Sequence, residues 1–138
     1  MRDRILAVDF GQRRLGLAVS DALGLASHPL PALSRRTPEL DGAALRALID
    51  DRDVRRLVVG LPLNMDGSEG PMASKARAFG AWLAELTGLP VDFEDERLST
   101  DEAEEFLRGA GLRPSDRKRL RDSVAAAVIL RAVLEREG

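Results

Sequence analysis

The chain of 138 residues contains no cysteine, a single histidine and few aromatic side chains. Without cysteine, disulfide bonds, thiolate metal sites and cysteine nucleophiles are excluded. A zinc site with two or more histidines is also excluded, and a Ser-His-Asp triad would have to use His28. Four phenylalanines, one tryptophan and no tyrosine offer little surface for stacking nucleobases, although stacking by Trp82 stays open.

Long apolar runs are absent as well. No stretch approaches the ~18 apolar residues of a membrane-spanning helix. Asp9 interrupts the first apolar run, which argues against a signal peptide. We therefore expect a cytoplasmic protein with no membrane partner. The length is typical of one domain, expected to span residues 1–138, and it suffices for a hydrophobic core without covalent cross-links.

Neither sign of charge dominates, because the formal net charge is −2. The charges are nevertheless separated along the chain. Residues 92–105 contain eight acids and one base, Arg97, whereas residues 113–121 contain five bases and one acid, Asp116. This pattern would suit a surface that holds a cation beside a phosphate backbone, but it is more often found on ordinary solvated loops and helix faces.

Hydrophobic periodicity and turn residues predict an alternation of strands and helices. Strands are expected at 4–10, 15–20, 26–34, 57–61 and 91–95, and helices at 40–49, 71–86, from a Ser99–Glu102 capping box to 109, and 116–135. The first three strands follow one another as an antiparallel meander, and the later strands are joined through helices and should run parallel. The predicted fold is therefore α/β, a mixed five-stranded sheet with helices on both faces.

Two acids follow strands of this sheet. Asp9 ends the first strand and Glu96 lies just past the last one, and in open α/β sheets ligands bind at the carboxyl ends of parallel strands. Alternation along residues 91–96 places Glu96 on the same face as Asp92 and Glu94, away from the expected core. Spacing alone does not choose among Asp92, Glu94, Asp95 and Glu96, and Asp9 is also compatible with a plain turn.

The strongest acidic signal precedes an apolar stretch of the last helix. Residues 124–130 carry no polar side chain, and helical spacing puts Asp122 on the same face as Ala125, Ala126 and Ile129. We therefore expect its carboxylate to point along the buried, sheet-facing side, where an unpaired charge is costly. The alternative is an aspartate in the first helical turn that is stabilised by the helix dipole.

Two strand ends and a helix can bring three carboxylates together. At ~4 Å and an effective dielectric of ~20, each pair repels by roughly 4 kcal/mol, and a divalent cation removes this repulsion. Ligands that are all oxygen favour Mg²⁺ or Mn²⁺ over Zn²⁺. Two such ions can activate a water and stabilise the leaving oxygen in phosphodiester cleavage.

Four segments together resemble the YqgF family. They are AVDFGQRRLGLAVSD at 7–21, VVGLPLNMDGSEG at 58–70, FEDERLST at 93–100 and DSVAAAVIL at 122–130. This family is similar to RuvC-type Holliday junction resolvases and has a ribonuclease H-like fold. The resemblance implies catalytic, metal-binding acids at Asp9, Glu96 and Asp122, with Asp116 as an alternative for the third.

The resemblance further implies a metal-dependent endonuclease that processes the 5′ end of the precursor of 16S ribosomal RNA. Holliday junction resolution is the competing assignment, and it would require a dimer because a junction is cut with two-fold symmetry. A monomer and a homodimer both stay open. Two further alternatives are a non-catalytic nucleic-acid-binding module and an ATP-binding domain of the sugar-kinase type, which normally needs two such domains.

Basic side chains near these acids are candidates for holding the phosphate backbone, which positions a nucleic acid without reading its sequence. Those we expect to bind nucleic acid are Arg13, Arg14, Arg97, Arg117, Lys118 and Arg119. For the hairpin arginines a plain exposed turn, and for Arg97 an ion pair with an acid, explain the sequence equally well.

Overall fold

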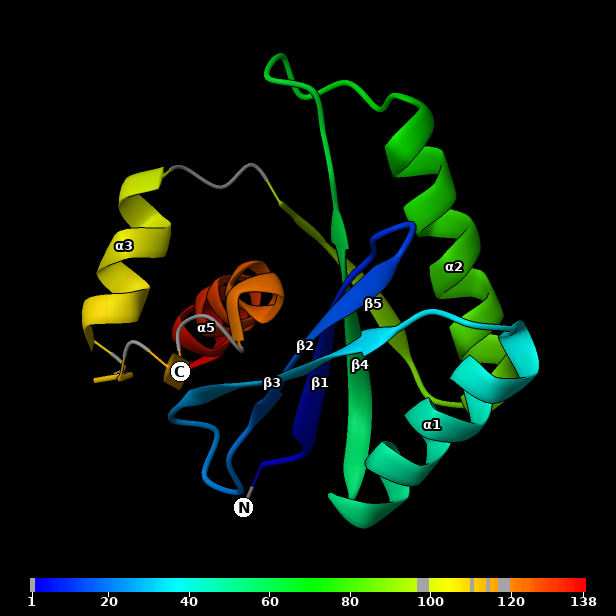
Figure 1. Ribbon diagram of the computed structural model, residues 1–138, viewed down its shortest axis with the longest axis horizontal. Coiled ribbons are helices and arrows are strands. Elements are labelled where there is room, and N and C mark those ends of the chain that lie inside the picture. Colours follow the sequence, from blue (N-terminus) through cyan, green and yellow to red (C-terminus); the bar gives the residue numbers. More distant parts are fainter. Residues whose placement is uncertain (1, 97–99, 110, 114, 117–119) are drawn as a thin grey trace.

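The computed structural model describes residues 2–96, 100–109, 111–113, 115–116 and 120–138 (Figure 1). Its strands are β1 (Arg4–Asp9), β2 (Arg14–Ser20), β3 (Ser27–Ser34), β4 (Val54–Leu61) and β5 (Val91–Asp95). Its helices are α1 (Pro38–Asp51), α2 (Pro71–Thr87), α3 (Thr100–Gly109) and α5 (Val124–Glu137), with a 3-10 turn at Arg121–Ser123.

The five strands form one mixed sheet in the order β3-β2-β1-β4-β5. β1 and β3 both pair antiparallel with β2, whereas β4 pairs parallel with β1 and β5 pairs parallel with β4. The predicted meander and the predicted parallel strands are therefore confirmed. Because β1, β4 and β5 are parallel neighbours, their carboxyl ends meet at one edge of the sheet.

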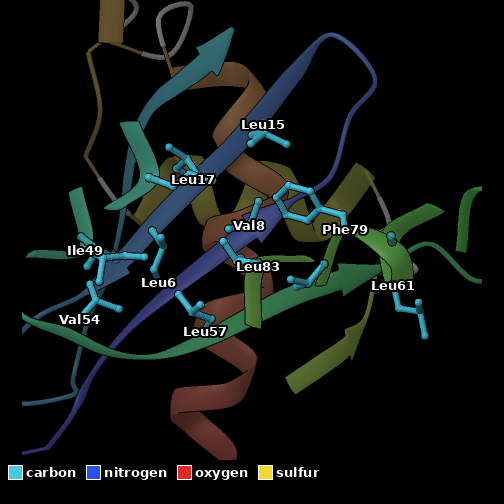
Figure 2. Close-up of a cluster of buried hydrophobic side chains, with 14 of the residues drawn as sticks. Leu6, Val8, Leu15, Leu17, Ile49, Val54, Leu57, Leu61, Phe79 and Leu83 are labelled. Atoms are coloured by element: carbon cyan, nitrogen blue, oxygen red, sulfur yellow. The ribbon is translucent and has the colours of Figure 1, made fainter. Parts of the chain in front are cut away.

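Helices cover both faces of the sheet, as expected (Figure 1). Alternate residues of β1 supply two separate cores, because successive side chains of a strand point to opposite faces. Leu6 and Val8 pack with side chains of α1 and α2, and Figure 2 shows part of this cluster. Ile5 and Ala7 pack with residues of α5 and with Phe106 of α3. β1 is thus buried on both sides, which explains its continuous apolar sequence.

Local signals account for several helix boundaries. Thr37 caps α1 by accepting a hydrogen bond from the Leu40 backbone N–H at 3.1 Å. Pro71 opens α2, and Gly88 ends it in the left-handed conformation (φ 69°) that glycine adopts without strain. The expected Ser99 cap of α3 lies outside the described residues. No described helix combines the length and hydropathy that crossing a bilayer would require.

The prediction of one continuous last helix over 116–135 is wrong. Residues 116 and 120 are helical, but a 3-10 turn at Arg121–Ser123 interrupts the segment before α5 begins at Val124. The reason is Ser123, whose fully buried hydroxyl accepts a hydrogen bond from the Leu17 backbone N–H at 3.0 Å and donates one to the Leu30 carbonyl. These bonds fix the turn onto β2 and β3, where the pairing between those strands is irregular.

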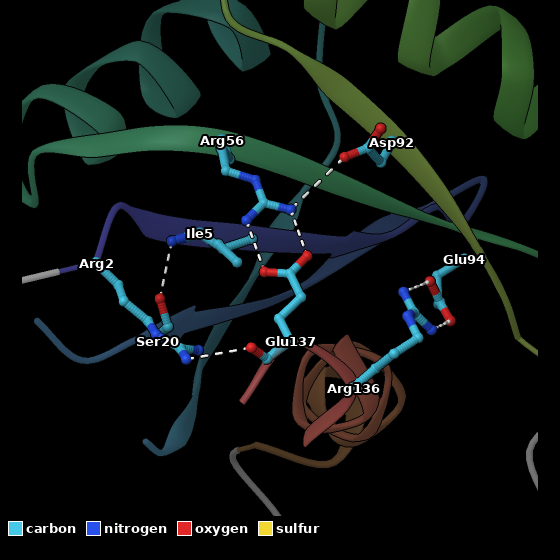
Figure 3. Close-up of polar contacts among 8 residues, drawn as sticks. All are labelled: Arg2, Ile5, Ser20, Arg56, Asp92, Glu94, Arg136 and Glu137. Carbon is cyan, nitrogen blue, oxygen red and sulfur yellow. Dashed lines mark hydrogen bonds and ion pairs between the residues drawn. The ribbon is translucent and has the colours of Figure 1, made fainter. Parts of the chain in front are cut away.

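Ion pairs hold the other end of α5 against the sheet (Figure 3). Arg56 of β4 donates two hydrogen bonds to Glu137, at 2.9 and 2.8 Å. Arg136 donates two to Glu94 of β5, at 2.7 and 2.8 Å. Asp92 lies 3.8 Å from the Arg56 guanidinium. Each of these three carboxylates therefore faces an arginine.

Candidate active site at the carboxyl edge of the sheet

Asp9 and Glu96 lie on the two strands that flank β4. Asp9 is the last residue of β1, and Glu96 follows the last residue of β5. The Glu96 backbone N–H donates to the Leu61 carbonyl at 3.0 Å, which extends the pairing with β4 by one residue. Both acids are only partly exposed. The parallel arrangement therefore brings together two acids that are 87 positions apart in the sequence.

Gly60 of β4 leaves the space in which these side chains meet. A Cβ atom at Gly60 would lie 2.7 Å from Glu96 Oε2 and 2.7 Å from Ile129 Cδ1. The Glu96 side chain therefore crosses the strand over a position that has no side chain. We did not predict this role for Gly60, although an isolated glycine inside an apolar strand is the usual signal of a close approach.

A hydrogen bond links the side chains of the two acids. It lowers the pKa of Asp9 and raises the pKa of Glu96. Burial, this hydrogen bond and the charge of Asp9 raise the pKa of Glu96 from 4.5 to about 10. Burial also raises the pKa of Asp9. Both groups thus resist carrying full negative charge together.

Asp122 lies near this pair, but not in the predicted way. Its negative charge contributes to the raised pKa of Asp9, so the three acids gather in one region. However, Asp122 is part of the 3-10 turn, and its side chain is 47% exposed. Arg14 Nε lies 2.9 Å from Asp122 Oδ2. The expectation that this carboxylate points along the buried face of a helix is wrong, because Asp122 lies in a 3-10 turn and Ser123 occupies the buried position.

Gly16 of β2 allows the Asp122 turn to approach Asp9. A Cβ atom there would overlap the carbonyl oxygen of Asp122 and lie 3.3 Å from Asp9 Cβ. Asp116 instead pairs with Arg113, whose Nε is 3.3 Å away. Because Asp122 and not Asp116 influences the pKa of Asp9, the geometry favours Asp122 as the third acid of this region.

The basic residues that we expected to contact nucleic acid are only partly described. Arg13 lies in the turn between β1 and β2, Arg14 is the first residue of β2, and both are exposed. Arg14 is engaged by Asp122. The other four candidates, Arg97, Arg117, Lys118 and Arg119, lie outside the described residues.

The donor set at this edge suits a hard divalent cation. No described lysine or arginine pairs with Asp9 or Glu96, so no described base compensates the charge of the two carboxyl groups. Carboxylate oxygens are the ligands that Mg²⁺ and Mn²⁺ prefer. Among the described side chains, no group of three acids or histidines is arranged to hold a metal ion. Asp9 and Glu96 therefore supply two ligands, and Asp122 is the nearest further acid.

Comparison with known sequences gives a consistent result. A family model described as RuvX, Holliday junction resolvase, matches residues 3–136. A relative from Koribacter versatilis, named as a pre-16S rRNA nuclease, is 45% identical over 98% of this chain and 88% of its own length. A relative of the same name from Anaeromyxobacter sp. strain Fw109-5 is 47% identical over 96% of each chain.

Solved structures share the fold. RuvC of Thermus thermophilus, solved with a Holliday junction substrate, has a TM-score of 0.61 and is 23% identical over 99% of this chain and 97% of its own. The fowlpox virus resolvase, solved with Holliday junction DNA, has a TM-score of 0.66 and is 8% identical over 97% of this chain and 98% of its own. The ribonuclease H-like fold that RuvC-type enzymes share is therefore the fold of this chain.

Proposed function

Because this chain belongs to the RuvX family of Holliday junction resolvases, we propose that it is a divalent-metal-dependent nuclease acting at the Asp9–Glu96 edge. It hydrolyses phosphodiester bonds, and its substrate is the 5′ end of the precursor of 16S ribosomal RNA. The names of the relatives support this substrate. The observation that carries the proposal is the convergence of Asp9 and Glu96 over Gly60.

In this proposal Asp9 and Glu96 serve the reaction and do not stabilise the fold. Two partly buried carboxyl groups without an arginine between them weaken the fold, because burial disfavours their charged forms. Asp9 and Glu96 would hold Mg²⁺ or Mn²⁺, with Asp122 completing the ligands once it leaves Arg14. A bound divalent cation supplies an activated water and neutralises charge that develops on the phosphate. A purely binding module would have no use for this arrangement.

The chain's own residues would position the substrate. Arg13 and Arg14 stand beside Asp9 on an exposed turn, where their guanidinium groups can hold phosphate oxygens. A phosphate that binds Arg14 would also compete with Asp122 for it, which would free the third acid as the substrate arrives. We extend the same backbone-holding role to Arg97, Arg117, Lys118 and Arg119.

A second candidate function is resolution of branched DNA. The description of the matching family and the solved junction complexes of similar fold favour it. Junction resolution requires two active sites, so this candidate also requires a homodimer, whereas processing of an RNA end does not. We propose that either reaction takes place in the cytoplasm.

One cleavage comparison tests the proposal. The purified protein is given a precursor 16S rRNA fragment and a synthetic four-way DNA junction, each with Mg²⁺, with Mn²⁺ and with a chelator. We expect metal-dependent cleavage of the RNA, and no cleavage of it by Asp9→Asn. Faster cleavage of the junction would instead favour the resolvase. Binding of both substrates without cleavage under either metal would overturn the nuclease proposal.

A further inference from the structure

Three of the five aromatic residues of the chain line one cavity on the opposite face of the sheet from the acids. They are Phe10, Phe79 and Trp82, and the cavity has a volume of about 330 Å³. The ring centroids of Phe10 and Phe79 are 5.1 Å apart, and those of Phe79 and Trp82 are 5.5 Å apart. Phe79 is buried, whereas Phe10 and Trp82 are partly exposed, so the accessible aromatic surface of the cavity belongs to Phe10 and Trp82.

Two basic side chains, Arg35 and Lys75, line the same cavity. The Arg35 guanidinium lies over the Phe10 ring, 4.9 Å from its centroid, and donates to the Gly11 carbonyl at 3.1 Å. Lys75 of α2 also lines the cavity, and no described residue forms an ion pair or hydrogen bond with it. The one acid of the lining, Asp41, is buried, accepts a hydrogen bond from the Arg36 backbone N–H at 3.0 Å and lies 3.9 Å from Arg35 Nε. The charge of Arg35 is therefore partly compensated, whereas Lys75 leaves a positive charge beside the aromatic side chains.

The cavity is next to the acids in the chain. Phe10 directly follows Asp9, and consecutive Cα atoms are only about 3.8 Å apart. The Asp9 and Phe10 side chains point to opposite faces of the sheet. A ligand that contacts both the acids and the cavity would therefore pass over the carboxyl edge of the sheet. A strand of nucleic acid with one phosphate at Asp9 would bring its neighbouring nucleotide to this rim.

We propose that this cavity binds an unpaired nucleotide adjacent to the phosphate that is cleaved. Its base stacks on the partly exposed Trp82, and Lys75 contacts a phosphate that flanks it. Aromatic stacking accepts any base, so the cavity selects an unpaired strand and not a sequence. This proposal rests on the nuclease function above and adds to it a requirement for single-stranded character beside the cleavage point.

Trp82 allows a direct test, because it is the only tryptophan of the chain. A short single-stranded RNA is added to the protein in the presence of a chelator, so that no cleavage occurs, and the tryptophan fluorescence is followed. We expect the fluorescence to be quenched on binding. In Lys75→Ala the Kd from this titration should rise several-fold. Arg55→Ala serves as the matched control, because Arg55 lies near the amino end of β4 and pairs with Asp53 at 3.0 Å.

A second measurement uses labelled RNA and variants of Trp82. Trp82→Leu should raise the Kd by about tenfold, the order expected for loss of one base stack, whereas Trp82→Phe should retain most of the affinity. An RNA with one abasic nucleotide beside the cleavage point should bind the wild type as weakly as intact RNA binds Trp82→Leu. Thermal melting of each variant verifies that it is folded.

The outcomes separate this proposal from the nuclease proposal. Quenching without cleavage under any metal would support the cavity and overturn the nuclease. Cleavage without quenching, with Trp82→Leu binding as tightly as the wild type, would overturn the cavity and leave the nuclease standing. A change in tryptophan fluorescence that depends on protein concentration alone, and is unaffected by RNA, would also overturn it, because the cavity would then be a contact between two copies of the chain.

Discussion

Glu94 and Glu96 are two residues apart near the end of one strand, on one face of the sheet, yet their surroundings are opposite. Glu94 receives two hydrogen bonds from Arg136, at 2.7 and 2.8 Å. Glu96 faces the carboxylate of Asp9 across Gly60. The first arrangement is the ordinary way in which a folded protein accommodates a carboxylate. The arrangement of Glu96 opposite Asp9 is electrostatically unfavourable unless a cation binds between the two carboxyl groups.

This difference separates structural from functional acids without reference to any relative. Asp92, Glu94 and Glu137 all have arginine partners, and the pairs of Glu94 and Glu137 tie α5 to the sheet (Figure 3). At the carboxyl edge, Asp9 and Glu96 have no basic partner among the residues that the structure describes. Perturbed pKa values that arise from burial and a like-charged neighbour are typical of functional sites. The contrast between Glu94 and Glu96 can therefore be tested with matched variants.

The largest expected effect is on cleavage. Glu96→Gln removes a proposed metal ligand while keeping the size of the side chain, so the rate of RNA cleavage should fall by at least about 100-fold, as when one electrostatic contact to a transition state is lost. Glu94→Gln, two residues away, should cleave at close to the wild-type rate. Steady-state rates of both variants with saturating Mg²⁺ provide the measurement. An equal loss of cleavage rate in the two variants would mean that any substitution near the end of β5 impairs cleavage, and that the Glu96 carboxylate has no special role.

The next effect concerns the glycine over which Glu96 crosses. Gly60→Ala places a Cβ atom 2.7 Å from Glu96 Oε2 and Ile129 Cδ1, so either the acid or the core must move. We expect a loss of roughly 1–3 kcal/mol in the free energy of unfolding, as for overpacked cores, together with reduced cleavage. Gly109→Ala is the matched control, since a Cβ atom there meets nothing within 4 Å. Urea unfolding of both variants measures the difference, and equal stability would refute the close approach.

A third prediction concerns pH. The metal-free folded protein keeps a proton on Glu96 up to a pKa of about 10, whereas the unfolded chain releases it near 4.5. Unfolding therefore releases a proton throughout this window, and the free energy of unfolding should decrease as the pH rises from about 5 to about 9. Glu96→Gln should lose most of this slope, and Glu94→Gln should keep it. Melting temperatures across the pH range in chelator measure it, and a stability that increases with pH would contradict the raised pKa of Glu96.

The smallest effect is expected at the exposed pair of Arg14 and Asp122. Their side chains are 57% and 47% exposed, so Arg14→Ala should change the free energy of unfolding by less than about 1 kcal/mol. The same variant should bind Mn²⁺ more tightly, because Asp122 is then free, and should bind RNA more weakly. Arg13→Ala, next to it on the same turn, should weaken RNA binding without changing the affinity for Mn²⁺. Calorimetry with each ligand distinguishes the two, and identical effects would remove the special role of Arg14.

The sheet could be predicted because its signals are local and strong. The continuous apolar sequence predicted β1. The alternation of Val91 and Phe93 with acidic neighbours predicted β5. The proline and the glycine at its two ends predicted the bounds of α2. The carboxyl-edge rule then placed Asp9 and the acids at the end of β5 at one edge of the sheet, and the family resemblance selected Glu96 among them. Membership of the family is confirmed, whereas the roles of individual site residues and the single-domain organisation stay predictions.

The failures came from contacts between distant segments. Helical spacing assigned Asp122 to a buried face, but hydrogen bonds from Ser123 to two strands turned that part of the chain into a 3-10 turn. Nothing in the local sequence specifies those partners. The aromatic cavity was missed for the same reason, because Phe10 and Phe79 are far apart in the sequence and a composition averages over the whole chain.

The binding of a divalent cation tests the assignment of the metal site to Asp9 and Glu96 most directly. Mn²⁺ is titrated into the metal-free protein at neutral pH by calorimetry, in two buffers of different ionisation enthalpy. We expect binding accompanied by proton release, because the cation displaces the proton from Glu96, and we expect Glu96→Gln to bind much more weakly while Glu94→Gln binds like the wild type. Binding of unchanged affinity in Glu96→Gln, with the same number of protons released, would contradict the assignment.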